Sequence, residues 1–284
     1  MNELLNHPLV IQLIEMSFTE DIGSGDHTSL ATIDKAATGK SIIVAKEDGV
    51  LAGVLLGEYI FKKVDAGLDV KLLKKDGSLV KEGEVVMEVK GSSISMLTAE
   101  RTVLNFIQRL SGVSTQTSRY VKVLEGLHTQ ILDTRKTTPG MRLLEKWAVK
   151  NGGGANHRIG LYDMILIKDN HIDFAGGIAQ ALSRTQQYLK TNQLDLKIEI
   201  ETRNFAEVNE VIAIGGVNRI MLDNFSIPML TEAVQLIDKR FETEASGGIT
   251  LETLRAYAET GVDFISSGAL THSVKSLDLS MRAG

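Results

Sequence analysis

Charged residues close several short apolar runs in the second half of the chain. Lys168 follows "MILI", and Glu201 and Asp223 stand at the ends of "KIEIE" and "RIMLD". An amine in such a position can clamp an anion, or it can form a Schiff base as the lysine of barrel aldolases does. Carboxylates can hold Mg²⁺, or they can simply pair with lysines. The residue types alone leave these alternatives open.

Several cations gather near these runs. They are Arg135, Lys136, Arg158 and Lys168, with His157 as a further candidate. Arginine binds carboxylates and phosphates through two nitrogens at once, although a single arginine is more often an ion-pair partner. Four cations at predicted strand ends, with few acids beside them, indicate a ligand that carries several negative charges.

Glycine and serine follow the last two apolar runs. The sequences are "SGG" at 246–248 and "SSGA" at 266–269. Glycine lets backbone N–H groups approach a ligand closely, and in α/β barrels the loops after the final strands commonly bind phosphate. Two ordinary glycine turns would give the same letters, but their place at consecutive strand ends favours a phosphate site.

The elements that carry these residues have one repeated form. A short, mostly apolar segment ends in charged, serine or glycine residues at 130–136, 164–170, 197–203, 219–225, 241–248 and 262–269. Segments of helical period lie between them, which is typical of βα units and a parallel sheet. No Gly-x-Gly-x-x-Gly or P-loop motif is present, so a nucleotide-binding doubly wound sheet is disfavoured. The pattern predicts an α/β barrel with about six strands.

The first part of the chain has a different pattern. Residues 3–17 predict an amphipathic helix that Pro8 interrupts, residues 41–97 predict short strands joined by Gly turns, and residues 98–125 predict a helix. On that last helix Arg101 shares one face with other polar residues, as on a solvated surface. Residues 76–90 weakly resemble a lipoyl or biotinyl half-barrel.

Composition limits the class of protein. The 284 residues are 43% hydrophobic and 24% charged, with a net charge of −5 and no cysteine. We expect no disulfide, no thiolate metal site, no nucleic-acid surface and no membrane span, and a cytoplasmic location is compatible. His7, His27, His128, His171 and His272 show no metal-ligand spacing. The residues thus indicate a barrel enzyme for a small phosphorylated, carboxylated substrate, with Mg²⁺ as a candidate cofactor.

Several motifs together resemble one family. "EDIGSGDHTS", "TAERTVLNFIQRLSGVST", "EASGGI", "VDFISSGALTHS" and the long "DTRKTTPGMRLLEKWAVKNGGGANHRIGLYDMILIKDNH" stand in order between about residues 15 and 275. They resemble quinolinate phosphoribosyltransferase, the carboxylating nicotinate-nucleotide pyrophosphorylase. The resemblance implies transfer of phosphoribosyl from phosphoribosyl pyrophosphate (PRPP) to quinolinate, with loss of CO₂, in NAD biosynthesis. It also implies Mg²⁺ and no organic cofactor.

The resemblance further implies an α/β fold in two domains. Residues 1–110 would form an α/β sandwich-like domain, on which residues 271–284 pack, and residues 111–270 an incomplete, roughly six-stranded barrel. It implies a homodimer in which Arg101 reaches the neighbouring site. Glu201 and Asp223 would hold ribose hydroxyls and Mg²⁺. The substrate-binding residues would be Arg101, Thr134, Arg135, Lys136, His157, Arg158, Lys168, Glu201, Asp223, Ser246, Gly247, Gly248, Ser267, Gly268, Ala269 and His272, with Lys136, Lys168, Glu201 and Asp223 catalytic.

Three alternatives stay open beside this assignment. The first is a related phosphoribosyltransferase with another pyridine-like acceptor. The second is a Schiff-base barrel lyase that uses Lys168 as the nucleophile. The third is a carrier module built on the half-barrel-like segment, although no lysine stands at a clear hairpin tip there.

Overall fold

The computed structural model describes residues 2–284, so Met1 of the expected N-terminal domain lies outside the described residues. The chain forms two compact units. The first consists of residues 2–118, Lys136–Gly153 and Leu270–Gly284, and the second of Arg119–Arg135 and Gly154–Ala269.

The first unit is α/β, with an antiparallel sheet in the order β12-β1-β5-β3 and a two-stranded β2-β4 ladder. Its helices are α1 Asn2–Leu5, α2 Pro8–Asp21, α3 His27–Thr32, α4 Val54–Val64, α5 Ser93–Val123 (continuing past the unit) and α6 Arg142–Asn151. Its strands are β1 Thr38–Ala45, β2 Gly49–Val50, β3 Asp69–Leu72, β4 Leu79–Val80, β5 Val85–Ser92 and β12 Leu279–Ala283.

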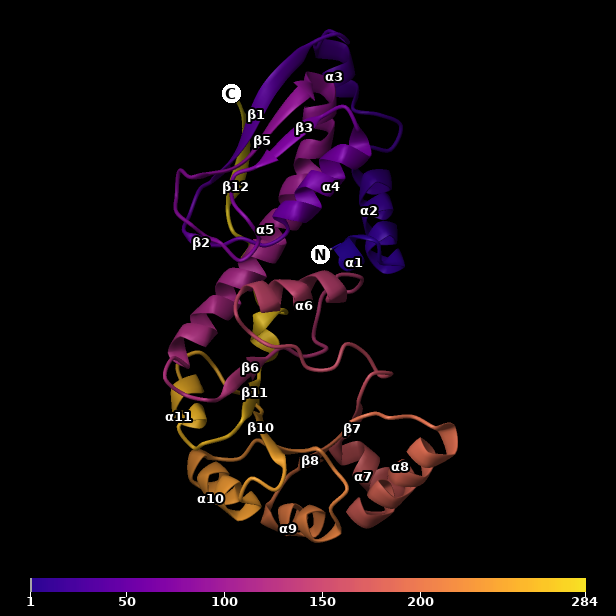
Figure 1. Ribbon diagram of the computed structural model, residues 1–284, viewed down its shortest axis with the longest axis vertical. Coiled ribbons are helices and arrows are strands. Elements are labelled where there is room, and N and C mark those ends of the chain that lie inside the picture. Colours follow the sequence, from indigo (N-terminus) through magenta and orange to yellow (C-terminus); the bar gives the residue numbers. More distant parts are fainter. Residues whose placement is uncertain (1) are drawn as a thin grey trace. The chain divides into compact units, whose positions relative to one another are not determined.

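Packing of α4 against α5 forms part of the core of this unit. Phe61, Ile107 and Leu110 are fully buried. A Cβ at Gly57 would lie 2.6 Å from the Ile107 Cδ1 atom, so a larger residue at this position would displace the buried Ile107 side chain. The long helix α5 stands behind the strands in Figure 1.

The start of α2 and the last strand, β12, are two local features of this unit. The predicted interruption at Pro8 marks the first residue of α2, where proline is favoured because its missing N–H needs no partner. At the other end of the chain, β12 pairs antiparallel with β1, and Leu279 lies opposite Ala45. The last residues of the chain therefore complete the sheet of the first unit.

The second unit contains a parallel sheet of six strands in the order β6-β11-β10-β9-β8-β7. The strands are β6 Gln130–Leu132, β7 Ile165–Ile167, β8 Ile198–Thr202, β9 Arg219–Asp223, β10 Glu242–Ser246 and β11 Phe264–Ser266. The helices are α7 Asp169–Ala175, α8 Ile178–Asn192, α9 Phe205–Ile214, α10 Ile227–Ile237 and α11 Leu254–Ala258, followed by the 3-10 turn Gly268–Leu270.

This sheet is an incomplete barrel, as the sequence predicted. In the sheet order β6 and β7 are the edge strands, and helices such as α8, α9 and α10 cover its outer side (Figure 1). Ile200, Ile220 and Ile265 are fully buried, as expected for parallel strands that are covered on both faces. The α/β class and the six predicted strands are confirmed.

The two compact units divide the chain differently from the expected domains in two places, and the domain limits themselves stay a prediction. The limit near residue 110 falls inside α5, which runs unbroken to Val123. Residues 136–153, which include α6, group with the first unit although we expected them in the barrel. Across residues 2–284, no helix combines the length and the apolar character needed to cross a membrane.

Candidate active site

The parallel strands bring the predicted residues of the second unit to one rim. Glu201 and Asp223 lie at the carboxyl ends of the neighbouring strands β8 and β9, and Lys168 follows β7 directly. Strands that run in one direction end on one side of the sheet, which is where barrel enzymes carry their sites. The other predicted residues of this unit are Thr134, Arg135, His157, Arg158, Ser246, Gly247, Gly248, Ser267, Gly268 and Ala269.

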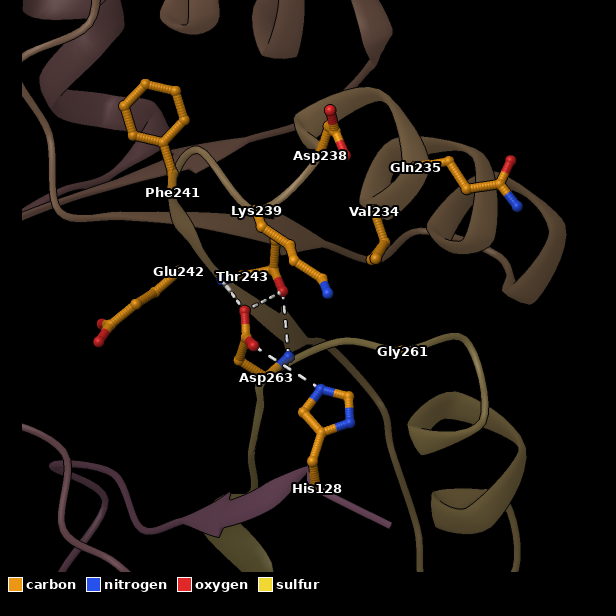
Figure 2. Close-up of a pocket in the computed structure, with 10 residues that line it drawn as sticks. All are labelled: His128, Val234, Gln235, Asp238, Lys239, Phe241, Glu242, Thr243, Gly261 and Asp263. Atoms are coloured by element: carbon orange, nitrogen blue, oxygen red, sulfur yellow. Dashed lines mark hydrogen bonds and ion pairs between the residues drawn. The ribbon is translucent and has the colours of Figure 1, made fainter.

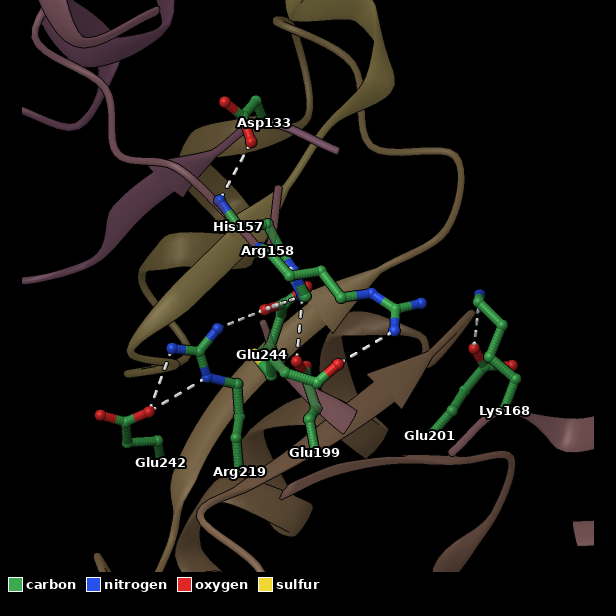
Figure 3. Close-up of polar contacts among 10 residues, drawn as sticks. Asp133, His157, Arg158, Lys168, Glu199, Glu201, Arg219, Glu242 and Glu244 are labelled. Atoms are coloured by element: carbon green, nitrogen blue, oxygen red, sulfur yellow. Dashed lines mark hydrogen bonds and ion pairs between the residues drawn. The ribbon is translucent and has the colours of Figure 1, made fainter. Parts of the chain in front are cut away.

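Lys168 and Glu201 form an ion pair between neighbouring strand ends (Figure 3). The distance from Lys168 Nζ to Glu201 Oε2 is 3.1 Å. The lysine side chain is 48% exposed, whereas the glutamate side chain is 8% exposed. The amine can therefore reach a ligand above the rim, and the carboxylate is held against the barrel interior.

Arg135 and Arg158 place like charges near each other. Burial lowers the pKa of Arg158 below its usual value, and the charge of Arg135 lowers that pKa further. Arg158 Nη1 donates to the carbonyl of Met164 at 3.2 Å, which fixes one end of its guanidinium. Two neighbouring cations at a strand-end rim favour an anionic ligand, because such a ligand relieves their repulsion.

The turn after β10 requires glycine. Gly247 has a φ of +101°, and a Cβ there would lie 2.2 Å from Asn224 Oδ1. Asn224 in turn donates from its side chain to Asp223 Oδ2 at 2.6 Å and from its backbone to Ser246 O at 2.8 Å. The same close packing thus shapes the glycine turn and orients the carboxylate of Asp223.

The turn after β11 is tied to the neighbouring edge strand. The backbone N–H of Ser267 donates to Leu132 O at 3.0 Å, at the carboxyl end of β6. Ser267 is 5% exposed, so its position is set by this contact.

A buried cluster centred on His157 lies inside the barrel (Figure 3). His157 Nε2 is 2.9 Å from Glu199 Oε2 and 3.6 Å from Glu244 Oε2, and both glutamate side chains are fully buried. The other ring nitrogen, Nδ1, accepts the backbone N–H of Arg158 at 2.7 Å, and Asp133 Oδ1 accepts the backbone N–H of His157 at 3.0 Å. The imidazole therefore faces protein groups through both of its nitrogens.

Arg219 supplies a positive charge to this cluster. Its Nη1 is 2.8 Å from Glu244, its Nη2 is 3.0 Å from Glu242, and its guanidinium lies 3.9 Å from the centre of the Phe264 ring. Burial raises the pKa of both Glu199 and Glu244 to about 7, and the charge of Glu199 adds to the effect on Glu244. Two neighbouring carboxyl groups that are both buried away from water favour a form in which one of them is protonated.

The His157, Glu199 and Glu244 cluster also has the donor types of a metal site. One ligand atom from each residue lies within 4.8 Å of the others, and no other group of this kind occurs among residues 2–284. The guanidinium of Arg219 already lies 2.8 Å from Glu244, so its charge would oppose a second cation at this place.

Sequence reasoning missed Glu199, Glu244 and Arg219. Glu199 stands two residues before Glu201, and alternate residues on a strand face the same side. The available signal was therefore a charged residue inside a predicted buried strand. We searched only the carboxyl ends of the strands, so this signal was not used.

Three predicted residues belong to the first unit. Arg101 is exposed on α5, and within residues 2–284 its side chain forms no hydrogen bond or ion pair. The Lys136 carbonyl accepts a hydrogen bond from Thr271 Oγ1 at 2.9 Å. His272 Nδ1 lies 2.6 Å from Ser273 Oγ.

A pocket of about 610 Å³ lies at the opposite ends of the strands (Figure 2). Its lining includes His128, Thr243 and Asp263, and Asp263 Oδ2 accepts from the Thr243 N–H and hydroxyl at 2.8 and 2.7 Å. None of the predicted site residues lines this pocket, so we place the candidate site at the carboxyl-end rim instead.

An incomplete α/β barrel with arginines, a lysine–glutamate pair and glycine turns at its carboxyl-end rim defines a class of protein that binds phosphorylated, anionic ligands. Comparison with known proteins specifies the family. Residues 26–111 match the family described as "Quinolinate phosphoribosyl transferase, N-terminal domain", and residues 113–282 match "Quinolinate phosphoribosyl transferase, C-terminal domain". The chain belongs to the quinolinate phosphoribosyltransferase family.

Relatives of known name agree with this assignment. The chain is 47% identical to quinolinate phosphoribosyltransferase [decarboxylating] 2a, mitochondrial, of Nicotiana tabacum, over 95% of this chain and 81% of the relative. It is 45% identical to the probable nicotinate-nucleotide pyrophosphorylase [carboxylating] of Bacillus subtilis, over 98% of this chain and 94% of the relative. The crystal structure of NadC from Streptococcus pyogenes matches with a TM-score of 0.92 and 39% identity, over 96% and 95% of the two chains.

Proposed function

We propose that this chain transfers the phosphoribosyl group of PRPP to quinolinate and releases nicotinate mononucleotide, pyrophosphate and CO₂. Two observations at the barrel rim carry the proposal. Arg135 and Arg158 are neighbours, and Lys168 forms an ion pair with Glu201. A dicarboxylate needs more than one cation, and the rim supplies Arg135, Arg158 and Lys168. The reaction belongs to NAD biosynthesis, and the names of the family relatives support it.

The first chemical step forms a bond between the ring nitrogen and C1 of the ribose while the C1–pyrophosphate bond breaks. Positive charge builds on the ribose, and carboxylates stabilise such a state in glycoside chemistry. Glu201 and Asp223 stand at neighbouring strand ends and are proposed for this role. The pyridine nitrogen is a weak nucleophile, so its positioning by Arg135 and Arg158 supplies much of the rate enhancement.

The second chemical step is loss of the carboxylate next to the ring nitrogen. Once the nitrogen is alkylated, the cationic ring holds the electron pair left when CO₂ departs, and the ring carbon then takes up a proton. This step needs no organic cofactor. Lys168 acts as an electrostatic clamp in this scheme, since its ammonium is paired with Glu201 and does not serve as a nucleophile.

We also propose that Glu201 and Asp223 hold Mg²⁺, directly or through substrate or water. Their carboxylate oxygens at adjacent strand ends fit the ligand preference of Mg²⁺. Bound there, the ion would offset charge on the pyrophosphate leaving group. Lys136 is proposed to contact the pyrophosphate as well. The glycine turns and His272 are proposed to bind the 5′-phosphate.

A homodimer is the proposed assembly, with Arg101 of each subunit completing the site of the other. The support is that Arg101 is exposed and that, in the described part of the chain, it has no partner within its own subunit. A cytoplasmic location stays a prediction, which fractionation of the source cells can test.

Product analysis tests the proposal directly. The protein is mixed with PRPP and Mg²⁺ and with either quinolinate or nicotinate, and nicotinate mononucleotide and CO₂ are measured. Product from quinolinate alone supports the proposal. Product from nicotinate instead would indicate a related phosphoribosyltransferase, and trapping of substrate on Lys168 by borohydride would indicate a Schiff-base lyase. Omission of Mg²⁺, with a chelator present, tests the metal.

A further inference from the structure

Arg109 on α5 and Glu145 on α6 form an ion pair within the first unit. Arg109 Nη2 and Nε donate to Glu145 Oε1 at 2.7 and 3.1 Å. The glutamate side chain is fully buried, and the arginine side chain is 22% exposed. Because the guanidinium is held through two of its nitrogens, its orientation is fixed and its remaining N–H groups point in set directions.

The carboxylate of Glu145 also holds the loop that follows Lys136. Glu145 Oε2 accepts the backbone N–H of Thr138 at 3.1 Å, and Oε1 accepts the Thr138 hydroxyl at 2.8 Å. Arg142 Nε donates to Thr137 Oγ1 at 3.1 Å. Helix α6 therefore fixes the two residues that come directly after Lys136.

The guanidinium of Arg109 holds a second segment. Nη2 donates to the Thr271 carbonyl at 2.6 Å, and Nη1 donates to the Val274 carbonyl at 3.3 Å. These two carbonyls stand on either side of His272. The arginine thus fixes the backbone from which the His272 side chain projects.

Thr271 joins the two segments. Its hydroxyl donates to the Lys136 carbonyl at 2.9 Å, and the residue is fully buried. One hydrogen-bonded circuit therefore runs from Arg109 through Thr271 to Lys136, and from Glu145 to Thr138 in the same loop. A buried polar circuit of this kind is rigid only while every member keeps its partner.

We propose that Arg109, Glu145 and Thr271 form a positioning cluster that sets Lys136 and His272 for binding PRPP. The inference rests on the proposed function, which gives Lys136 and His272 their ligand. The three residues of the cluster act through the backbone of the two segments and not by touching substrate. The cluster should therefore affect PRPP more than quinolinate.

The alternative is that the cluster only stabilises the fold. In that case its loss would lower the melting temperature and the amount of folded protein, while the folded fraction would keep the KM for both substrates. A split between the two KM values is therefore the measurement that separates positioning from stability.

Thr271→Val is the sharpest variant, because it removes the hydroxyl bond to Lys136 and keeps the Thr271 carbonyl that Arg109 needs. We expect the KM for PRPP to rise about tenfold and the KM for quinolinate to stay unchanged. Thr271→Ser restores the hydroxyl and should return the KM for PRPP toward its original value. Thr117→Val is the matched control, since Thr117 is equally buried but its hydroxyl donates to Val113 O in its own helix.

Calorimetric binding of PRPP without quinolinate provides a readout that does not depend on catalysis. If the unmodified chain binds PRPP but forms no product, weaker binding by Thr271→Val and rescue by Thr271→Ser would still support the cluster, although the proposed function would fail. An unchanged affinity and KM for PRPP in Thr271→Val and Arg109→Lys, with a lower melting temperature, would overturn the positioning role. Absence of PRPP binding by the unmodified chain would overturn both proposals.

Discussion

The ammonium of Lys168 lies 3.1 Å from the carboxylate of Glu201, between the ends of the neighbouring strands β7 and β8. The amine is already engaged by a carboxylate, whereas a Schiff-base nucleophile needs an amine that is free to attack a carbonyl carbon. The Glu201 side chain is nearly buried, so Lys168 also compensates a carboxylate that has little access to water. The geometry therefore supports a clamp in preference to covalent catalysis.

Replacing Lys168 tests the clamp. We expect Lys168→Ala to lower kcat/KM about 100-fold or more, because it removes a cation from the substrate anion and leaves Glu201 without its partner. Lys168→Arg keeps the charge and should retain more activity. Steady-state kinetics measure both variants. A borohydride-stable adduct on Lys168, found by mass spectrometry, would contradict the clamp.

Replacing Arg158 tests recognition of the dicarboxylate. Arg158→Lys keeps a charge but loses the planar pair of donors, so we expect the KM for quinolinate to rise about tenfold, or ~1.4 kcal/mol. Arg184→Lys, on the exposed face of α8, is the matched control and should leave the KM unchanged. Equal KM values for Arg158→Lys and the unmodified chain would assign the carboxylates to other residues.

The turn after β10 predicts a large loss of activity when a single methyl group is added at Gly247. In Gly247→Ala the new Cβ would meet Asn224 Oδ1 at 2.2 Å, so the turn and the Asp223 carboxylate must both shift. We expect kcat/KM to fall about 100-fold. Gly126→Ala is the control: Gly126 also has a positive φ, +83°, but nothing lies within 4 Å of its added Cβ. Equal kcat/KM in the two variants would show that the contact with Asn224 does not affect catalysis.

The buried carboxyl pair predicts a dependence of stability on pH. Burial raises the pKa of Glu244 from 4.5 to about 7 in the folded chain, so the folded state keeps a proton that the unfolded state releases. The stability this contributes is complete below about pH 4.5 and is lost as the pH rises through about 7. Glu244→Gln removes this carboxyl. Between about pH 4.5 and about 7, the unfolding free energy of this variant should therefore fall less steeply than that of the unmodified chain, by on the order of 1 kcal/mol per pH unit.

Denaturant unfolding at several pH values measures this effect. Glu242→Gln is the matched control, because Glu242 pairs with the same Arg219 through a side chain that is 40% exposed. A slope in Glu244→Gln equal to that of the unmodified chain would mean that Glu244 is ionised in the folded state throughout this range.

Mixing two inactive variants tests the shared site. Arg101→Ala and Lys168→Ala should each be inactive. An equal mixture that exchanges subunits should recover up to about one quarter of the unmodified activity, because about half of the dimers are hybrids and each hybrid has one intact site of two. Sedimentation would show whether Arg101→Ala forms the same dimer as the unmodified chain. Exchange without recovery would show that each subunit carries a complete site.

Local patterns in the sequence predicted much of the fold. The alternation of short apolar runs with helical segments gave six parallel strands, and the position of Lys168, Glu201 and Asp223 at the run ends placed them on one rim. This works because a parallel sheet converts position along the strand into position in space. The domain limit near residue 110 stays a prediction; it falls inside α5, which continues without a break to Val123.

Tertiary structure decided which side chains meet. The sequence presents Glu199 and Glu244 as single acids within buried strands, and only the folding of β8 and β10 toward one interior brings both near His157. It likewise gives no sign that Arg109, Glu145 and Thr271 join one circuit, because they are far apart in the chain. Residue order therefore determined the barrel and its rim, through hydrophobic period and strand direction. The buried polar clusters depended on long-range packing, which no local pattern encodes.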